Sequence, residues 1–298
     1  MKILLTGATG FVGSHLEPLL VRAGHVVRRV SRRPGFDFDW SDASLARGVR
    51  ESDAVIHLAG EGVFDKRWSA RRKQELYSSR IETTRKLAKL CAERKPSAFL
   101  SASAIGWYGT SETAEFDERS PHGVDFLASL CTDWEEATEA AVEAGVRVCR
   151  VRIGVVLHPA GGAVSKMLPF FKLGIGGPLG SGKQWVSWIH LADLCAIFRF
   201  LLEDENARGA FNGTAPNPVT MRAFAGALGR ALHRPSALPV PKPMLRLALG
   251  EVAETLTTGQ RVIPHRTMEA GFRFEHPEID EALASLFDRR GAVEGGVR

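Results

Sequence analysis

The chain has 298 residues, 44% of them hydrophobic, which is enough for one large domain with a sizeable core. No apolar run reaches about 18 residues and no signal peptide precedes the first predicted strand, so we expect a cytoplasmic protein without a membrane anchor. The net charge is +5, but the basic residues form no stripe with interleaved aromatics and the four cysteines lack metal-ligand spacing, so nucleic-acid binding, a metal site and disulfides are not expected.

The N-terminal segment carries a glycine turn between a short strand and a helix. Gly7, Gly10 and Gly13 follow an apolar strand over residues 3–5, and an amphipathic pattern over 11–22 predicts a helix. Glycines in this setting let backbone N–H groups approach a pyrophosphate at the helix N-terminus. The segment therefore predicts a dinucleotide site. The residues expected to contact the cofactor here are Gly7, Thr9, Gly10, Phe11, Val12 and Gly13.

The end of the second predicted strand, over 26–30, indicates which dinucleotide is bound. Ser31, Arg32 and Arg33 follow this strand, and no carboxylate occurs before Asp37. A carboxylate here would bind the adenosine ribose 2′-hydroxyl of NAD and repel a 2′-phosphate, whereas guanidinium groups bind the phosphate. The sequence therefore predicts NADP as the cofactor, with Ser31 and Arg32 in its site.

Strands and helices alternate up to residue 152. A strand over 53–60 ends in Leu58, Ala59 and Gly60, where small residues let the backbone come close to the cofactor, and His57 before them is expected to be a packed histidine. A helix over 67–94 with Ser69 as its N-cap, a strand over 97–103, a helix over 126–144 and a strand over 146–152 follow. This order predicts an α/β protein with a doubly wound parallel sheet, a Rossmann fold.

The alternation loosens after residue 152. Glycine-rich loops over 174–183 separate predicted helices over 163–172, 220–232 and 244–256, which favours a smaller, irregular C-terminal substrate lobe. We expect residues 1–240 to form the NAD(P)-binding domain, with the lobe drawn mainly from 158–190 and 214–240. Residues 241–298 are expected to form a small helical domain that ends in a frayed tail from residue 288.

Three segments together resemble the extended short-chain dehydrogenases/reductases. They are the glycine turn, the stretch from Ser103 to Gly109, and the stretch from Trp188 to Asp193. Further segments, among them 58–61, 79–84, 101–109 and 259–274, are similar to an atypical, epimerase-like branch with a small C-terminal domain. The resemblance covers nearly the whole chain and implies a Rossmann core and NADP binding. Val155, just after the strand over 146–152, completes the expected cofactor set.

The catalytic residues of that superfamily are only partly present. Its chemistry uses a tyrosine that relays the proton, a lysine that lowers the tyrosine pKa, a serine that polarises the substrate oxygen, and an asparagine. Ser103 matches the serine, but Phe126 and Leu130 occupy the tyrosine and lysine positions, and Arg80 aligns with the asparagine. Phe126 and Leu130 cannot transfer a proton.

One hypothesis is an enzyme with a rebuilt site, an NADP-dependent oxidoreductase or epimerase acting on a small polar metabolite, with a nucleotide sugar as one option. Ser103 and Tyr108 are its candidate catalytic residues, and Arg80 is a cation that replaces the lysine, with Glu75 as its partner or as a second ribose contact. The alternative roles are an exposed ion-pair network for Arg80 and Glu75, and packing at the sheet edge for Tyr108. The other candidate acids or bases are Lys183 and His190.

The second hypothesis is a sensor or scaffold protein that binds NADP(H) with little turnover, which the missing tyrosine and lysine favour. The glycine-rich loops between Gly176 and Trp188 argue for a substrate pocket instead. His190 and Asp193 are expected to cap a helix. The expected partner is a small molecule, and a homodimer is one option for the assembly.

Overall fold

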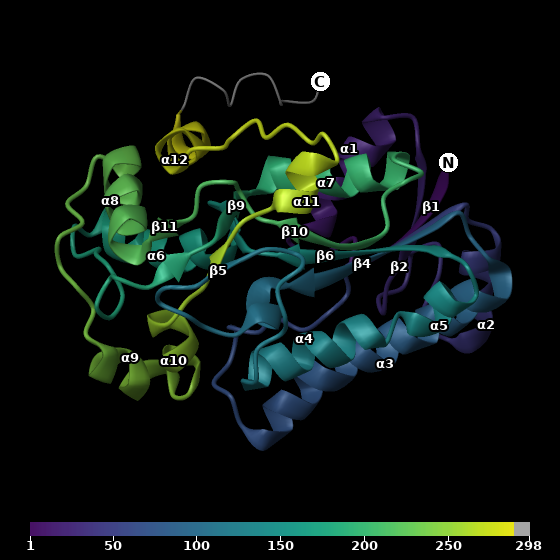
Figure 1. Cartoon of the computed structure of the whole chain (residues 1–298), viewed down its shortest axis with the longest axis horizontal. Helices are drawn as coiled ribbons and strands as arrows, with labels where there is room; N and C mark the ends of the chain where they lie inside the picture. Colours follow the sequence, from purple (N-terminus) through teal and green to yellow (C-terminus); the bar gives the residue numbers. More distant parts are fainter. Residues whose placement is uncertain (289–298) are drawn as a thin grey trace.

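The central element is a six-stranded parallel sheet with the order β2-β1-β3-β4-β6-β10 (Figure 1). The structure is a computed structural model and describes residues 1–288, so the predicted frayed tail lies outside the described residues except for Asp288. The doubly wound parallel sheet expected from the sequence is confirmed. Its strands are β1 (Lys2–Thr6), β2 (Val26–Val30), β3 (Ala54–His57), β4 (Ala98–Ala104), β6 (Arg147–Ile153) and β10 (Gly209–Gly213).

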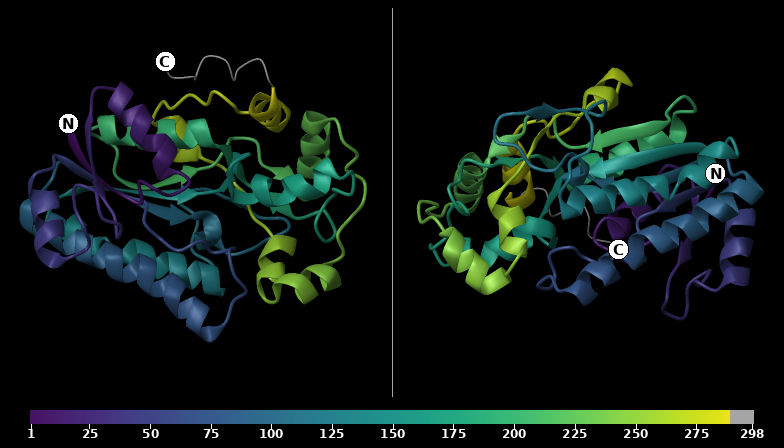
Figure 2. Two further views of the ribbon diagram at one scale, coloured as in Figure 1. Left: turned by 180° about the vertical axis from the view of Figure 1, so that it is seen from behind. Right: turned by 60° about the horizontal axis from the view of Figure 1, so that its bottom comes forward.

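Both faces of the sheet are covered by helices, which explains why its central strands β1 and β3 are mostly apolar. Along β1, Ile3 and Leu5 pack against one helical layer, while Leu4 packs against the other. One layer holds α1 (Gly13–Arg22) and α7 (Leu191–Glu203), and the opposite layer holds α2 (Asp42–Arg50), α3 (Ala70–Arg94), α4 (Phe126–Glu136) and α5 (Glu139–Glu143) (Figures 1 and 2).

The C-terminal lobe lies at the end of the molecule away from β2 (Figure 1). It has its own hydrophobic cluster, built around Trp188, Phe171 and Phe224. Its elements are β7 (Val155–His158), α6 (Gly162–Lys172), β8 (Trp185–Val186), β9 (Trp188–His190), β11 (Val219–Thr220), α8 (Met221–Leu232), α9 (Lys242–Leu249), α10 (Val252–Thr257) and α12 (Ile279–Phe287). Smaller elements connect it to the sheet: η1 (Ile105–Tyr108), β5 (Glu115–Phe116), β12 (Arg261–Val262) and α11 (His265–Glu269). Within residues 1–288, no helix is both long and apolar enough to cross a membrane.

Two predicted helices are each divided in the structure. The helix expected over 126–144 breaks between α4 and α5, where the Thr138 hydroxyl donates to the Glu135 carbonyl and accepts from Arg150 Nε. These side-chain bonds compete with the regular helical pattern. The helix expected over 244–256 breaks at Gly250, whose φ of +66° ends α9 before α10 begins. The single-helix predictions were therefore wrong at both places.

The start of α7 fixes the segment that leads to the C-terminus. His190 is the N-cap, as expected, because its Nδ1 accepts the Ala192 N–H at 3.2 Å. Asp193 has a different role from the predicted cap, since its carboxylate accepts the N–H groups of Glu275 and His276. The ring of His276 packs on that of His190, with centroids 3.9 Å apart. These contacts hold a distant segment against α7.

This arrangement predicts that acid weakens the fold. Burial, together with the neighbouring His276 and His158, lowers the pKa of His190 to about 4. Between the ordinary histidine pKa of about 6.5 and that value, the unfolded chain takes up a proton that the folded chain excludes, so stability falls as pH falls through this window. Asparagine caps helices well and does not titrate, so His190→Asn should lose less stability than the unmodified protein between about pH 7 and 5.

The measurement is urea denaturation at a series of pH values. His122→Asn, at an exposed histidine, is the matched control and should keep the slope of the unmodified protein. If the free energy of unfolding falls with pH equally in His190→Asn and His122→Asn, His190 is not the source of the acid sensitivity.

Candidate functional site at the carboxyl edge of the sheet

The glycine turn is shaped by contacts that leave no room for side chains. A Cβ on Gly13 would lie 2.2 Å from the Gly7 carbonyl oxygen, and a Cβ on Gly7 would lie 2.7 Å from the Leu58 carbonyl carbon. Gly7 also has a φ of +73°, which side chains disfavour. The N-terminus of α1 is thereby brought directly against the end of β1.

The turn and the end of β3 meet at the switch point of the sheet. The chain runs from β1 outward to β2 on one side and from β3 outward to β10 on the other, so the crevice opens between β1 and β3. Ala59 lies against Gly7, and its N–H points to Thr6 Oγ1 at 3.4 Å. Thr9 and Gly10, in the middle of the turn, are exposed to solvent. The structure thus brings the predicted residues of the turn together with Leu58, Ala59 and Gly60.

The end of β2 carries an exposed arginine, Arg32, and a buried serine, Ser31. The buried Ser31 accepts the Arg33 N–H at Oγ (3.0 Å), while the Arg32 side chain is 72% exposed. Arg32 Nη1 lies 3.8 Å from Glu61 Oε1. Since Glu61 follows β3, this ion pair crosses the carboxyl end of β1.

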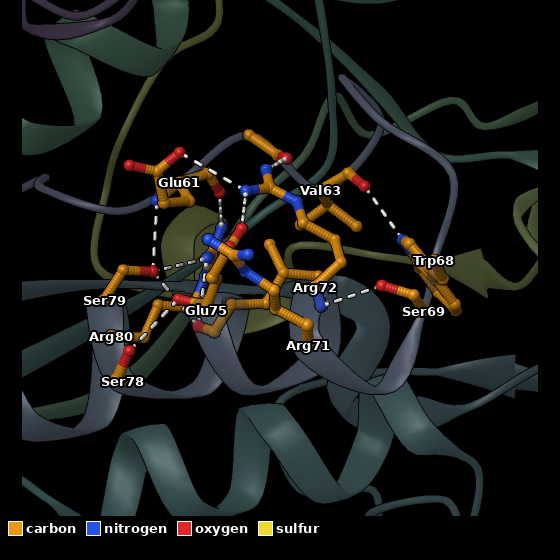
Figure 3. A network of polar contacts seen from close by, with 12 residues as sticks. Glu61, Val63, Trp68, Ser69, Arg71, Arg72, Glu75, Ser78, Ser79 and Arg80 are labelled. Carbon is orange, nitrogen blue, oxygen red and sulfur yellow. Dashed lines mark hydrogen bonds and ion pairs between the residues drawn. The ribbon is translucent and has the colours of Figure 1, made fainter.

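A network on α3 lies beneath the loop that follows β3 (Figure 3). Arg72 is almost fully buried and donates to the Gly62 carbonyl oxygen (2.6 Å) and to Glu75 Oε2 (3.0 Å). Glu75 also accepts from Arg71, which is exposed. Ser69 caps the helix by accepting the Arg72 N–H, as expected. Arg72 therefore points into the protein, unlike its exposed neighbour Arg71.

Arg80 is a buried cation that does not pair with Glu75. It donates to the backbone oxygens of Glu61 (2.7 Å) and Leu76 (3.3 Å) and packs over the Trp134 ring. Burial lowers the pKa of Arg80 to about 10, so it remains charged at neutral pH. A Cβ on Gly60 would touch its guanidinium at 3.4 Å. Arg80 thus fixes the backbone at Gly60 and Glu61, where the chain leaves β3.

A second buried network holds both candidate catalytic hydroxyls. Ser103 Oγ donates to Glu135 Oε1 (2.7 Å), and Arg152 forms a bidentate pair with Glu135 at 2.8 and 2.9 Å. Arg152 also donates to the Tyr108 hydroxyl (3.0 Å), which donates to Asn212 Oδ1 (2.7 Å). Burial raises the pKa of Tyr108 to about 12. In this arrangement both hydroxyls bond protein groups and are shielded from solvent.

The positions where a tyrosine and a lysine were absent from the sequence carry packed side chains. Phe126 opens α4, packs on Trp68 with centroids 5.1 Å apart and lies under Lys73 Nζ. Leu130 is buried. Val155 packs against the hydrophobic cluster of the lobe. Neither Phe126 nor Leu130 can transfer a proton, so α4 has no acid or base at the positions of the tyrosine and the lysine.

Sequence reasoning missed several residues that organise the site. Arg72 shares a helix face with Leu76 and Arg80, and this spacing is a signal that it points inward. Arg152 ends a buried strand, which is a second signal that a partner charge is needed. No local pattern pairs it with Glu135, which lies on another element. The residues missed are Glu61, Arg72, Glu135, Arg152 and Asn212.

Comparison with known families covers most of the chain. Residues 3–212 match the NAD dependent epimerase/dehydratase family, and residues 240–286 match a domain of unknown function, DUF1731. Residues 213–239 lie between the two matches.

Individual relatives are similar over nearly their full length. The mouse epimerase family protein SDR39U1 is 43% identical over 293 residues, which is 96% of this chain and 99% of the mouse protein. The chloroplastic SDR39U1 homolog of Arabidopsis thaliana is 42% identical, over 96% of this chain and 86% of that protein. A crystal structure of human SDR39U1 (isoform 2) with NADPH superposes with a TM-score of 0.92 and 38% identity, covering 97% of this chain and all of that one.

The buried Glu135–Arg152 pair predicts a strong asymmetry between single and double variants. Arg152→Met leaves a carboxylate buried without its partner and should cost about 3–5 kcal/mol of unfolding free energy. Adding Glu135→Leu removes that charge, so the double variant should be more stable than Arg152→Met alone. Chemical denaturation of the three proteins measures both effects.

Arg150→Met on the same strand is the control. Its partner Glu139 is 47% exposed, so this change should cost at most about 1 kcal/mol. A double variant no more stable than Arg152→Met would contradict the assignment of the pair as a coupled unit.

Proposed function

The chain belongs to the NAD dependent epimerase/dehydratase family, and on this premise we propose that it binds NADPH at the carboxyl ends of β1, β2 and β3. The observation that carries the proposal is the glycine turn, where the contacts at Gly7 and Gly13 exclude any Cβ and the residues just before α1, Thr9 and Gly10, are exposed. Such a cradle suits a pyrophosphate, because helix N-terminal N–H groups attract negative charge. The residues present therefore fit the cofactor.

Each part of the crevice has an expected partner on the cofactor. The backbone of the turn would hold the pyrophosphate, and that of Leu58, Ala59 and Gly60 would lie beside the adenosine ribose. Ser31 and Arg32 would bind the 2′-phosphate, since an exposed guanidinium can make charge-assisted bonds to it. The human relative solved with NADPH, 38% identical, supports this choice of cofactor. The turn residues in this role are Gly7, Thr9, Gly10, Phe11, Val12 and Gly13.

We further propose that the protein is an oxidoreductase or epimerase acting on a small polar metabolite, with a nucleotide sugar as one option. Bound NADPH supplies a hydride to a carbonyl carbon. Arg80 and Glu75 would act from α3 by fixing the β3 exit and the charge around it. Ser103 and Tyr108 shape the floor at the substrate end, and direct proton transfer from either would require the Glu135–Arg152 network to open. Val155 would bound the crevice on the lobe side.

The second candidate is an NADPH-binding sensor or scaffold with little turnover. Two observations favour it: apolar side chains stand where the proton relay normally lies, and both nearby hydroxyls already have protein partners. The two candidates share the cofactor site and differ only in whether a substrate reacts there.

We also propose a cytoplasmic location. The four cysteines are unpaired and buried, which suits a reducing compartment. Burial raises the pKa of Cys91, Cys131 and Cys195 to about 12, so they behave as packing residues.

The cofactor proposal predicts a clear preference in binding. NADPH should bind at least about tenfold more tightly than NADH, because only NADPH has a 2′-phosphate for Arg32 to bind. Arg32→Ala should remove most of this difference and change the NADH affinity by less than about twofold. Isothermal titration calorimetry measures all four affinities.

Arg47→Ala, at an exposed arginine of α2, removes the same charge away from the crevice and should leave both affinities unchanged. Equal affinities of the unmodified protein for the two cofactors would refute the preference. So would an Arg32→Asp variant that still prefers NADPH.

The enzyme proposal predicts turnover on a panel of carbonyl compounds and nucleotide sugars. A reductase consumes NADPH, which is followed by absorbance, whereas an epimerase inverts a carbon without net consumption, which is followed by NMR of the product. Activity on one class of compound, abolished when Arg32→Ala prevents NADPH binding at the concentration used, supports the enzyme. Tight NADPH binding without turnover on the panel favours the sensor.

A further inference from the structure

Glu61 stands between two guanidinium groups of different character. Its Oε1 lies 3.8 Å from Nη1 of Arg32, and its Oε2 lies 3.5 Å from Nη1 of Arg72. Arg32 comes from the end of β2, whereas Glu61 and Arg72 belong to the loop after β3 and to α3. Because β1 lies between β2 and β3, the Arg32–Glu61 pair spans the glycine turn at the place where the adenosine half of the cofactor is expected.

The backbone around Glu61 is held firmly (Figure 3). Its N–H donates to Ser79 Oγ (3.2 Å), and its carbonyl accepts from Arg80 Nη2 (2.7 Å). Behind its carboxylate, the Arg72 side chain is only 5% exposed and is fixed by Gly62 and Glu75. These contacts hold Glu61 in place independently of the position of the Arg32 side chain.

Arg32 has the opposite character, because its side chain is 72% exposed and Glu61 is its one ion-pair partner among residues 1–288. A guanidinium that turns toward a phosphate must leave a carboxylate behind. Glu61 can tolerate that loss, since Arg72 remains beside it. The carboxylate is thus a competitor for Arg32.

We propose that Glu61 is a specificity-determining residue that weakens NADPH binding by competing with the 2′-phosphate for Arg32. The inference rests on the proposed NADPH site. NADH has no 2′-phosphate that could bind Arg32, so Glu61 affects the affinity for NADH much less. The carboxylate therefore limits how far the site favours NADPH and eases release of the phosphorylated cofactor.

The test is the affinity of Glu61→Gln for both cofactors. Glutamine keeps the size of the side chain and removes its charge, so NADPH should bind about three to ten times more tightly, while the NADH affinity changes by less than about twofold. The gain should shrink in high salt, because salt screens exposed charges. Asp65→Asn, which removes an equal charge from the same loop where Asp65 pairs with Lys166, should not tighten NADPH binding.

A second pair of variants tests whether the effect acts through Arg32. In an Arg32→Ala background, adding Glu61→Gln should change the NADPH affinity by less than about twofold. The same gain in both backgrounds would overturn the competition, and so would a Glu61→Gln variant that binds NADPH no better than the unmodified protein. An unmodified protein without a preference for NADPH would contradict the proposed cofactor itself. A preference for NADPH that Glu61→Gln does not strengthen would contradict only the role of Glu61.

Discussion

The close contact between Gly13 and the carbonyl oxygen of Gly7 is the constraint on which the candidate site depends. It lets α1 begin directly at the end of β1, with no residue able to carry a side chain into the gap. The same turn lets the exit of β3 approach Gly7. A larger residue at either position would push α1 or β3 outward and separate the backbone groups that form the crevice. The parallel sheet brings the other loops of the candidate site to the same edge, because each of them follows the carboxyl end of a strand.

The sequence was sufficient for the parts of the molecule that depend on local pattern. The strands of the sheet and the long helices follow from apolar runs and helical spacing, and the glycine turn follows from its place between a strand and a helix. The break between α9 and α10 had a local signal in Gly250, which the single-helix prediction passed over. The break between α4 and α5 was missed because it comes from another element: Arg150 on β6 reaches Thr138, and no feature near Thr138 announces this contact. Partners of buried charges were missed for the same reason. Tyr108 and Asn212, for example, are 104 residues apart in sequence yet share a hydrogen bond.

The two buried networks divide the site into parts with different physical roles. The α3 network beneath the β3 exit has exposed members, such as Arg71 and Glu75, and can respond to a charged ligand above it. The network of Ser103, Glu135, Arg152 and Tyr108 is closed, and each of these side chains bonds another member. A closed ionic network in low dielectric is costly to disturb, because removing any partner leaves a buried charge or donor unsatisfied. The α3 network is therefore partly open to solvent, whereas the network around Arg152 is buried.

This division separates the binding of a cofactor from the chemistry done with it. In the arrangement that the superfamily normally uses, a tyrosine and a lysine on one helix connect the two, since the lysine binds the ribose and also activates the tyrosine. Here α4 contributes Phe126 and Leu130, which pack but do not ionise. The cation nearest to that role, Arg80, donates to the backbone oxygens of Glu61 and Leu76 and so supports the cofactor side. Proton transfer in the proposed enzyme would therefore need either a group outside α4 or the opening of the network that holds Ser103 and Tyr108.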